Sequence, residues 1–343
     1  MGTLQFLPFY ERLTARIPGN IFSRLSISAL LGLIFLAAQW ASIGNRALHD
    51  WSWFLGLLIT TMMLCLYIAT YTLHELLSRM AIYLSSDNQA NSVYLKDTLS
   101  DRNFVVVGSI FGALNCVIGH CFGLPYSHGP AIVSILFGYF LVGFVGGMAV
   151  LGIYGVFVAV RNFSRELKPA LDFTSPDNCG GTLFIGDALV VFSAVTLIAG
   201  VMISIYILKT DWAGNHSWEI MALKGFWIVF PYIMSLIILI IPAIPVHIEL
   251  RNYQLEQEES LKKQLVAIRR RSEDSQLDGA RRKELRDDLE FHQNARLELH
   301  GMRLWPYGIG GSSKYIIILV TNLATTFSTV SGWLKSLKIL AWW

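Results

Sequence analysis

Residues 174–187 of the chain read TSPDNCGGTLFIGD, and this short polar stretch separates two long apolar runs. Its paired glycines, Gly180 and Gly181, permit backbone conformations with positive φ, and Pro176 stiffens the approach to them. Asp177 or Asn178 is suited to an Asx turn, in which the side chain bonds to the backbone two residues on. We call residues 174–187 the island, and the sequence predicts a rigid turn there that leads into a helix.

The chain around the island is strongly apolar. Of its 343 residues, 54% are hydrophobic and 15% are charged, whereas about 25% are charged in a typical soluble protein. A helix of about 20 apolar residues crosses the hydrocarbon core of a bilayer, and six runs reach that length: 25–43, 53–72, 104–123, 131–160, 185–208 and 226–248. Because backbone groups in lipid must be satisfied internally, we expect an all-α fold, a polytopic membrane helix bundle of about six spans within residues 1–248.

Residues 249–304 differ sharply, because they hold 12 of the 27 Lys and Arg residues and 12 of the 24 Asp and Glu residues. Narrow apolar stripes precede and follow a polar break at 272–279, which predicts a coiled-coil-like helical hairpin. We call residues 249–304 the arm. Its basic runs, 269–271 and 281–283, lie beside acidic residues, so a solvated surface is favoured and no nucleic-acid partner is expected.

Basic residues outside the spans orient the chain, because they accumulate in cytoplasmic segments. A cytoplasmic N-terminus places nine of them in inner segments: Arg12, Arg16, Arg24, Arg79, Lys96, Arg102, Arg161, Arg165 and Lys168. Only three then fall in outer loops: Arg46, Lys209 and Lys224. The sequence therefore predicts that the N-terminus, the island and the arm all lie in the cytoplasm.

Three interpretations of the island are open. In the favoured one it is a rigid turn, and Asp187 caps the fifth span by accepting hydrogen bonds from its first N–H groups. In the second, Asp177 and Asp187 stand at the inner mouth of a cavity and attract cations. In the third, the glycine N–H groups bind an anion, which two aspartates disfavour. The candidate residues are Pro176, Asp177, Gly180, Gly181 and Asp187.

Glycines in the third and fourth spans have the spacing that lets two helices approach closely: Gly108 and Gly112, then Gly143 and Gly147. Tight packing within one chain is the favoured explanation. The alternative is a water-lined pathway that Asn115 and His120 face.

The sixth span ends with Ile-Pro-Ala-Ile-Pro-Val-His at residues 241–247. Each proline removes a backbone donor and clashes with the preceding turn, so a kink is expected. Pro242, Pro245 and His247 are therefore the candidate residues of a gating hinge between the sixth span and the arm.

Residues 305–343 form a C-terminal amphipathic segment. Its polar face includes Thr321, Asn322, Thr325 and Thr329. An interfacial or re-entrant segment is favoured, because lysines flank both ends and fix no direction. The alternative is a seventh span whose hydroxyl face lines a pore.

From residue 174 onward the chain resembles a group of uncharacterised bacterial multi-pass membrane proteins that share a P-D-x-x-G-G-L type motif before a membrane helix. The similarity is carried by Pro176-Asp177-x-x-Gly180-Gly181, by Ile244-Pro245-Val246-His247 and by Trp305-Pro306. The chain departs from that pattern at Thr182, where the group usually has Leu. The resemblance implies a bacterial inner-membrane location and supplies no activity.

No residue pattern in the sequence predicts catalysis. The four cysteines lack the C-x₂-C spacing of zinc sites, and no nucleophile–base set or phosphate loop is found. We therefore predict no catalytic, metal-binding or cofactor-binding residue, and the absence of an enzyme activity is favoured. One expected function is an oligomeric channel or membrane effector that is gated through the arm. The alternative is a non-conducting sensor or scaffold whose arm docks a cytoplasmic protein or small-molecule ligand.

Overall fold

The computed structural model describes residues 9–10, 20–45, 52–83, 98–123, 131–166, 171–210, 218–272 and 279–336. Within these ranges every regular element is a helix and no strand occurs, which confirms the all-α prediction. Most of the arm's predicted polar break (272–279) and the end of the C-terminal segment (337–343) lie outside the described residues.

Within the residues that the structure describes, six helices are long and apolar enough to cross a membrane, as a multi-pass membrane protein requires. They are α2 (Asn20–Ile43), α4 (Ser52–Tyr83), α6 (Asp101–Cys121), α7 (Ala131–Glu166), α8 (Leu183–Lys209) and α9 (Trp218–Ile240). The expected runs and these helices coincide in the apolar parts. However, α4 and α7 extend past residues 72 and 160, where the predicted apolar runs end. A helix satisfies its own backbone hydrogen bonds, so it can continue beyond the apolar run into polar surroundings. In α4 the added turns include an ion pair of 2.6 Å between Arg79 and Glu75.

The sixth span ends earlier than expected, at Ile240 instead of 248. Ile241 and Pro242 form a turn, and α10 (Ala243–Ser272) begins directly after them. Pro242 has no N–H to continue the α9 ladder, so the helix breaks there. Pro245 lies in the first turn of α10, where its missing N–H leaves no intrahelical bond unmade.

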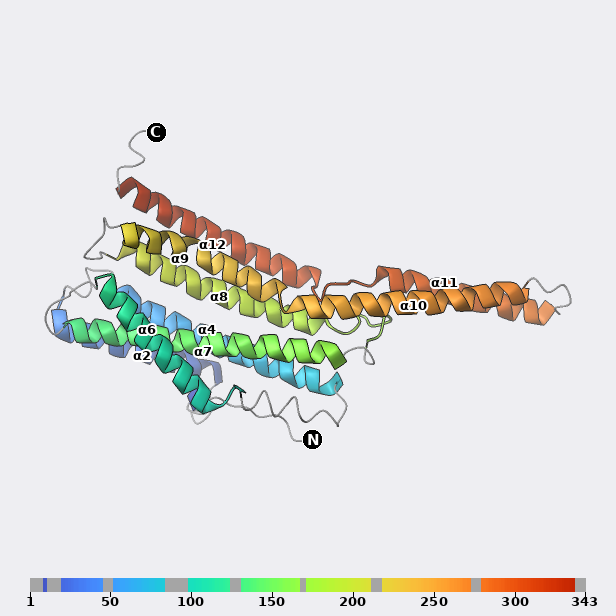
Figure 1. Ribbon diagram of the computed structural model, residues 1–343, viewed down its shortest axis with the longest axis horizontal. Helices are drawn as coiled ribbons and strands as arrows, with labels where there is room; N and C mark the ends of the chain where they lie inside the picture. The colour runs from blue at the N-terminus through green and yellow to red at the C-terminus, as the bar shows by residue number, and fades with distance from the viewer. Residues whose placement is uncertain are drawn as a thin grey trace.

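The core of the bundle forms around α4 and α8, which contact each other. Helix α4 also packs against α2 and α7, and α8 packs against α9 (Figure 1). Leu58 and Ile59 of α4 and Leu189 and Leu197 of α8 are almost fully buried. These side chains fill the centre, whereas large apolar side chains on α2, α6 and α9 remain exposed, as expected of helices that face lipid.

Helix α6 crosses α7 obliquely and contacts it closely (Figure 1). A Cβ atom on Gly143 would lie 2.5 Å from the carbonyl oxygen of Phe111, and one on Gly112 would lie 2.9 Å from that of Phe140. Both distances are too short for a Cβ atom. The glycine spacing in the third and fourth spans is therefore explained by backbone contact within one chain.

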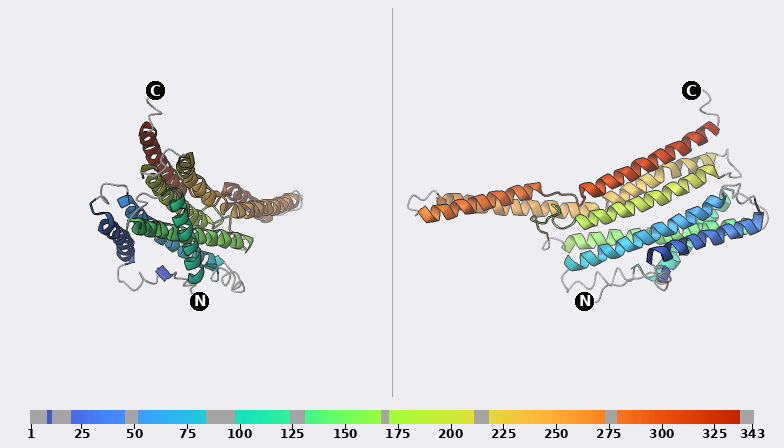
Figure 2. Two further views of the ribbon diagram at one scale, coloured as in Figure 1. Left: turned by 60° about the vertical axis from the view of Figure 1, so that its left-hand side comes forward. Right: turned by 180° about the vertical axis from the view of Figure 1, so that it is seen from behind.

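The arm is an antiparallel pair of helices, α10 and α11 (Gly279–Gly301), that projects from one end of the bundle (Figures 1 and 2). Leu261 and Ile268 of α10 and Leu299 of α11 are buried in its seam. Charged side chains make up much of the remaining surface, and Lys262 and Lys263 pair with Glu258 and Glu259 at 2.9 and 2.8 Å.

The C-terminal segment contains one long helix, and its expected interfacial or re-entrant placement in the membrane stays a prediction. Helix α12 (Ile309–Ser336) is continuous and packs against α8, and it forms the outer edge of the bundle in Figure 1. The hydroxyl of Tyr232 in α9 donates to the carbonyl of Asn322 at 2.9 Å and lies 2.6 Å from the Thr326 hydroxyl. Tyr315 reaches the buried Ser235 hydroxyl at 2.8 Å. These polar contacts between helices fix α12 beside the bundle.

Candidate functional site

The island folds around the carboxylate of Asp177. Its Oδ1 accepts hydrogen bonds from the N–H groups of Cys179 at 2.8 Å and Gly181 at 3.0 Å, and Oδ2 accepts from Leu183 at 3.2 Å. Leu183 is the first residue of α8, so the carboxylate satisfies an N–H that the helix itself leaves free. Its negative charge also lies at the positive end of the helix dipole.

The expected cap, Asp187, was the wrong residue. Helix α8 begins at Leu183, so Asp187 lies one turn inside it, where its N–H is already within the helix ladder. Its side chain is exposed and interacts electrostatically with Lys314, Arg79 and Glu75. Thr182 occupies the N-cap position, but its hydroxyl donates to the Cys179 carbonyl at 2.7 Å and makes no capping bond.

Positive φ angles shape the turn before α8. They occur at Asn178 (54°), Gly180 (62°) and Gly181 (86°), a region that glycine enters without steric cost. These angles direct the three N–H groups toward Asp177. The island is therefore a turn closed around Asp177, and the rigidity expected of it stays a prediction.

The hydrogen bonds of this turn change the pKa of the Asp177 carboxyl group. Partial burial raises its pKa, but the bonds from Cys179, Gly181 and Leu183, with a further one from Ser175, outweigh burial. The pKa of Asp177 is consequently lower than its ordinary value, and the group is ionised at neutral pH. Both oxygens are engaged by the backbone, which leaves this carboxylate a weak candidate for a cation at a cavity mouth.

The segment between α11 and α12 crosses directly over the island. We call residues 302–308 the return segment. The N–H of Arg303 donates to the carbonyl of Asn178 at 2.6 Å, and the buried thiol of Cys179 donates to the carbonyl of Trp305 at 3.7 Å. Burial, with a smaller effect of Asp177, raises the pKa of Cys179 to about 11, so the group stays a neutral donor.

Gly186 allows the closest approach between the return segment and α8. A Cβ atom there would lie 1.5 Å from the carbonyl oxygen of Pro306. Gly308 is less tightly placed, because its Cβ atom would lie 3.0 Å from the side-chain atom Cδ1 of Leu183. Only glycine at residue 186 leaves room for the return segment.

The first turns of α10, where the arm begins, also contact the return segment. His247 Nδ1 lies 2.8 Å from the carbonyl oxygen of Leu304, and its ring stacks on Trp305 with centroids 4.4 Å apart at 14°. Tyr307 donates its hydroxyl to the carbonyl of Leu239 near the end of α9. Of the predicted hinge residues, Pro242 breaks the helix, whereas His247 connects α10 to the return segment.

Apolar packing completes this connection. A Cβ atom on Gly180 would lie 3.0 Å from Met302 and 3.2 Å from Leu171 and Leu250, and Leu250 of α10 is fully buried. The island, the first turns of α10 and the return segment thus form one interlocked unit, which we call the junction. It joins α8, α9, α10, α11 and α12.

The two residues of the predicted pathway are not brought together around a channel. Asn115 donates its side-chain N–H to the carbonyl of Tyr139 at 2.7 Å, across the α6–α7 contact. His120 is exposed near the end of α6. The first residue therefore serves helix packing, and the second faces the surroundings of the chain.

The predicted polar face of α12 is satisfied within the helix. The hydroxyls of Thr321, Thr325 and Thr329 each donate to the carbonyl four residues earlier, at 2.8 to 3.0 Å. The amide of Asn322 donates to Ile318 at 2.7 Å. Such side chains are compatible with lipid, because their donors are paired, and a water-filled pore is not required to solvate them.

Several structurally important residues had no recognised signal in the sequence. Gly186 and the return segment are far apart along the chain, so their contact could not be predicted. The signal that could have been used is a glycine near the start of a span, which permits another segment to approach closely. Gly200 packs against Pro231 in the middle of α9, with its Cβ position 2.5 Å from the proline Cβ. Ser193 and Ser235 join α8 to α9 through hydroxyls 2.7 Å apart.

No protein-family model, curated protein or solved structure matches this chain. Within the described ranges, no three His, Cys, Asp or Glu side chains gather as a metal site would require. The resemblance at the island to bacterial membrane proteins stays a prediction. The candidate functional site is therefore defined by its geometry, as the junction of the arm with the membrane helices.

Proposed function

We propose that this protein is a membrane-embedded sensor, in which the arm binds a cytoplasmic protein and the junction transmits that event to the membrane helices. One observation carries the proposal. Both helices of the arm are connected to the return segment, α10 through the contact of His247 with Leu304 and α11 because the segment follows it in the chain, and Arg303 of that segment bonds to the island just before α8. A rotation of the arm therefore acts on α8 and α12 together instead of being absorbed by a loose linker.

The surface of the arm suits a protein partner. Leu255 and Val266 on α10 and Phe291 and Leu297 on α11 are each at least half exposed. They stand among charges of both signs, and apolar anchors within a polar surround are typical of protein interfaces. The proposed location is the inner membrane of a bacterium, with the arm in the cytoplasm, as the distribution of Lys and Arg favours.

Distances between spin labels test whether the arm is rigidly joined to the bundle. Labels are placed at Lys263→Cys in the arm and Asn45→Cys at the opposite end of the bundle, in a Cys121→Ser background. A single narrow distance distribution is expected, and it should broaden in His247→Ala/Trp305→Ala. The control is Trp218→Ala/His120→Ala, which removes two exposed rings. A broad distribution in the parent protein would refute the rigid connection.

Photo-crosslinking in intact cells tests whether the arm has a protein partner. A photoreactive residue is placed at Phe291 or Leu297 of the full-length chain, and at Leu114, which is exposed on α6, as a control. The same protein adduct is expected from both arm positions and not from α6. Absence of any protein adduct at both arm positions would argue against docking.

An oligomeric channel is the second candidate, favoured by the position of α12. This helix contacts α8 along one side and leaves Ile317, Val320 and Phe327 exposed, so a neighbouring subunit has a surface to cover. Ion flux in proteoliposomes and a subunit count test it together. A strict monomer that conducts no ions would exclude a shared pore.

A further inference from the structure

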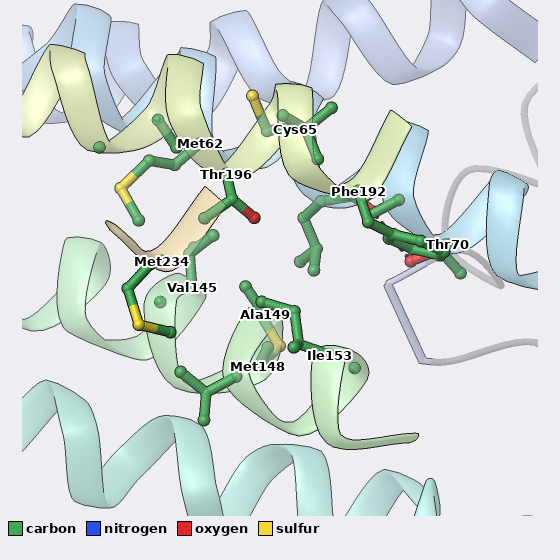
Figure 3. Close-up of a pocket in the computed structure, with 18 of the residues that line it drawn as sticks. Met62, Cys65, Thr70, Val145, Met148, Ala149, Ile153, Phe192, Thr196 and Met234 are labelled. Atoms are coloured by element: carbon green, nitrogen blue, oxygen red, sulfur yellow. Dashed lines mark hydrogen bonds between the residues drawn. The ribbon is translucent and has the colours of Figure 1, made fainter. Parts of the chain in front are cut away.

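An apolar cavity lies inside the bundle among α4, α7, α8 and α9, and Figure 3 shows its lining. Its volume is about 200 Å³. Met62, Met148, Phe192 and Met234 are among the side chains around it, and Thr196 is one of few polar ones. An engineered apolar cavity of roughly 150 Å³ excludes water and binds benzene, so this one is large enough for an apolar ligand.

The cavity is elongated along the helices. Its lining runs from Met62 to Leu77 on α4 and from Phe192 to Ile203 on α8. At 1.5 Å per residue these stretches are about 22 and 16 Å long. A space with this shape fits an extended chain better than a compact molecule.

Helices α7 and α9 both line the cavity but do not pack extensively against each other. Helix α7 packs against α2, α4, α6 and α10, but it has no extensive contact with α8 or α9. Val150 of α7 lines the cavity and is 47% exposed, and Phe230 lines it from α9. All four surrounding helices are candidate membrane spans, so the medium beside α7 and α9 is the hydrocarbon of the bilayer.

Two glycines of α7 leave this space unfilled. A Cβ atom on Gly152 would meet nothing within 4 Å, and one on Gly146 would meet only Met62 Cε, at 3.7 Å. The neighbouring Gly143 and Gly147 are instead required by contact with α6, where a Cβ atom would come within 3.0 Å of other atoms. Helix packing therefore explains Gly143 and Gly147, but it does not explain Gly146 and Gly152.

We propose that this cavity is a lipid-binding site that holds one acyl chain of a membrane phospholipid. Water is a poor occupant, because it needs two to four polar partners and the lining is almost wholly apolar. An empty cavity forfeits dispersion contacts along its walls, and an acyl chain restores them. The chain enters between α7 and α9, directly from the adjacent bilayer.

Native mass spectrometry of the full-length protein tests the site by counting retained lipids. The variant is Gly152→Leu, whose side chain occupies the cavity without a clash at Cβ. The matched control is Gly225→Leu, because Gly225 is exposed on α9, has nothing within 4 Å of its Cβ position and does not line the cavity. The parent protein and the control should keep one phospholipid after delipidation, and Gly152→Leu should lose it.

Fluorescence quenching locates the retained chain. Trp227 lines the cavity, so phospholipids with brominated acyl chains should quench it in the parent protein. The part of the quenching that belongs to Trp227 is the part lost in Trp227→Phe. That part should also be lost in Gly152→Leu, and it should remain in Gly225→Leu. If Gly152→Leu fails to fold, Ala149→Leu fills the same cavity from one turn away on α7.

Three results would overturn the proposal. Equal lipid retention by the two leucine variants would place the lipid elsewhere. A retained molecule that is not a phospholipid would replace the assigned ligand with another apolar one. A dimer that Gly152→Leu converts to a monomer would show that a second copy of the chain fills the cavity.

Discussion

Asp177 shows how much of this molecule depends on one side chain. Its carboxylate gathers three backbone N–H groups, orders the turn through Asn178 and Gly181, and begins α8. The same turn presents the Asn178 carbonyl to Arg303. The capping of α8 and the contact between the island and the return segment thus both depend on the Asp177 side chain.

Removing that carboxylate should destabilise the start of α8. Asp177→Ala leaves three N–H groups without their acceptor, and loss of a side chain that accepts from the first N–H groups of a helix costs about 1 kcal/mol. A lower melting temperature in detergent is the expected measurement. The control is Asp187→Asn, which changes an exposed carboxylate of the same helix and should have little effect. Equal destabilisation by the two variants would contradict the capping role.

The contribution of Asp177 should depend on pH. Its pKa is lower in the folded chain than in the unfolded one, so the stabilisation is complete above the unfolded pKa of about 3.9 and is lost as pH falls through the folded pKa. The melting temperatures of the parent and Asp177→Ala should therefore converge only below about pH 4. If the difference in melting temperature between the parent and Asp177→Ala stays constant from neutral pH to well below the folded pKa, the stabilisation does not come from the ionised carboxylate.

Gly186 provides the sharpest steric test of the junction. In Gly186→Ala the new Cβ atom coincides with the Pro306 carbonyl, so the return segment must move or the protein must misfold. The expected result is a loss of folded, monodisperse protein in size-exclusion chromatography. Gly225→Ala, with open space around it, should be neutral or slightly stabilising, because alanine favours helix over glycine. A normal elution profile for Gly186→Ala would show that the junction is looser than described.

Among the elements, the arm is the one that combines a soluble surface with a short apolar seam. Its stability depends on few side chains, since most of its length is charged and exposed. Leu299 is fully buried in the seam and its carbonyl accepts a bond of 3.0 Å from Gln254. The seam continues directly into the junction, where Met302 and Leu250 are buried.

The seam predicts a contrast between two leucines of α11. Leu299→Ala should cost about 2–5 kcal/mol, as is usual for a buried leucine, and should speed amide hydrogen exchange in α10 and α11. Leu297→Ala, two residues away and 69% exposed, should leave exchange unchanged. If the arm is coupled to the bundle, exchange at the start of α8 will also rise in Leu299→Ala. Identical exchange in the two variants would show that the seam is not what stabilises the arm.

For the whole molecule, the arrangement of the helices implies one topology. Helices α4 and α7 end, and α8 begins, at the end of the bundle from which the arm projects (Figure 1). The exposed tryptophans Trp40 and Trp218 belong to the opposite end, near the end of α2 and the start of α9. Indole rings favour the membrane interface, so the two ends of the bundle mark its two faces.

Cysteine labelling in oriented vesicles tests this topology. In a Cys121→Ser background, Lys263→Cys in the arm should react with a membrane-impermeant maleimide only in inside-out vesicles. Asn45→Cys, at the other end of the bundle, should react only in right-side-out vesicles. Labelling of both positions from one side would contradict the six-span arrangement, and reversal of both would invert the orientation.

The sequence predicted some parts of the candidate site and missed others. The island was recognised as a turn, because its Asp-Asn and Gly-Gly pairs have conformational preferences that need no neighbours. The wrong aspartate was chosen as the cap, since the first residue of α8 was placed two positions too late. The role of Cys179 was not predicted at all, because its partner Trp305 is 126 positions away.

The sequence alone determined the helical class, the apolar spans and their separation from a charged arm. Lipid imposes these features locally, through the length of each apolar run and the need of every backbone group for a partner. The packing of α12 against α8, the close approach of the return segment to Gly186 and the cavity beside Gly152 follow from the three-dimensional structure. Those outcomes depend on side-chain shapes from distant segments that meet in space, and no local period or composition records which segments will meet. The island depends on both local sequence and tertiary contacts. Its turn follows from its own residues, whereas the junction forms only when α10 and the return segment pack against it.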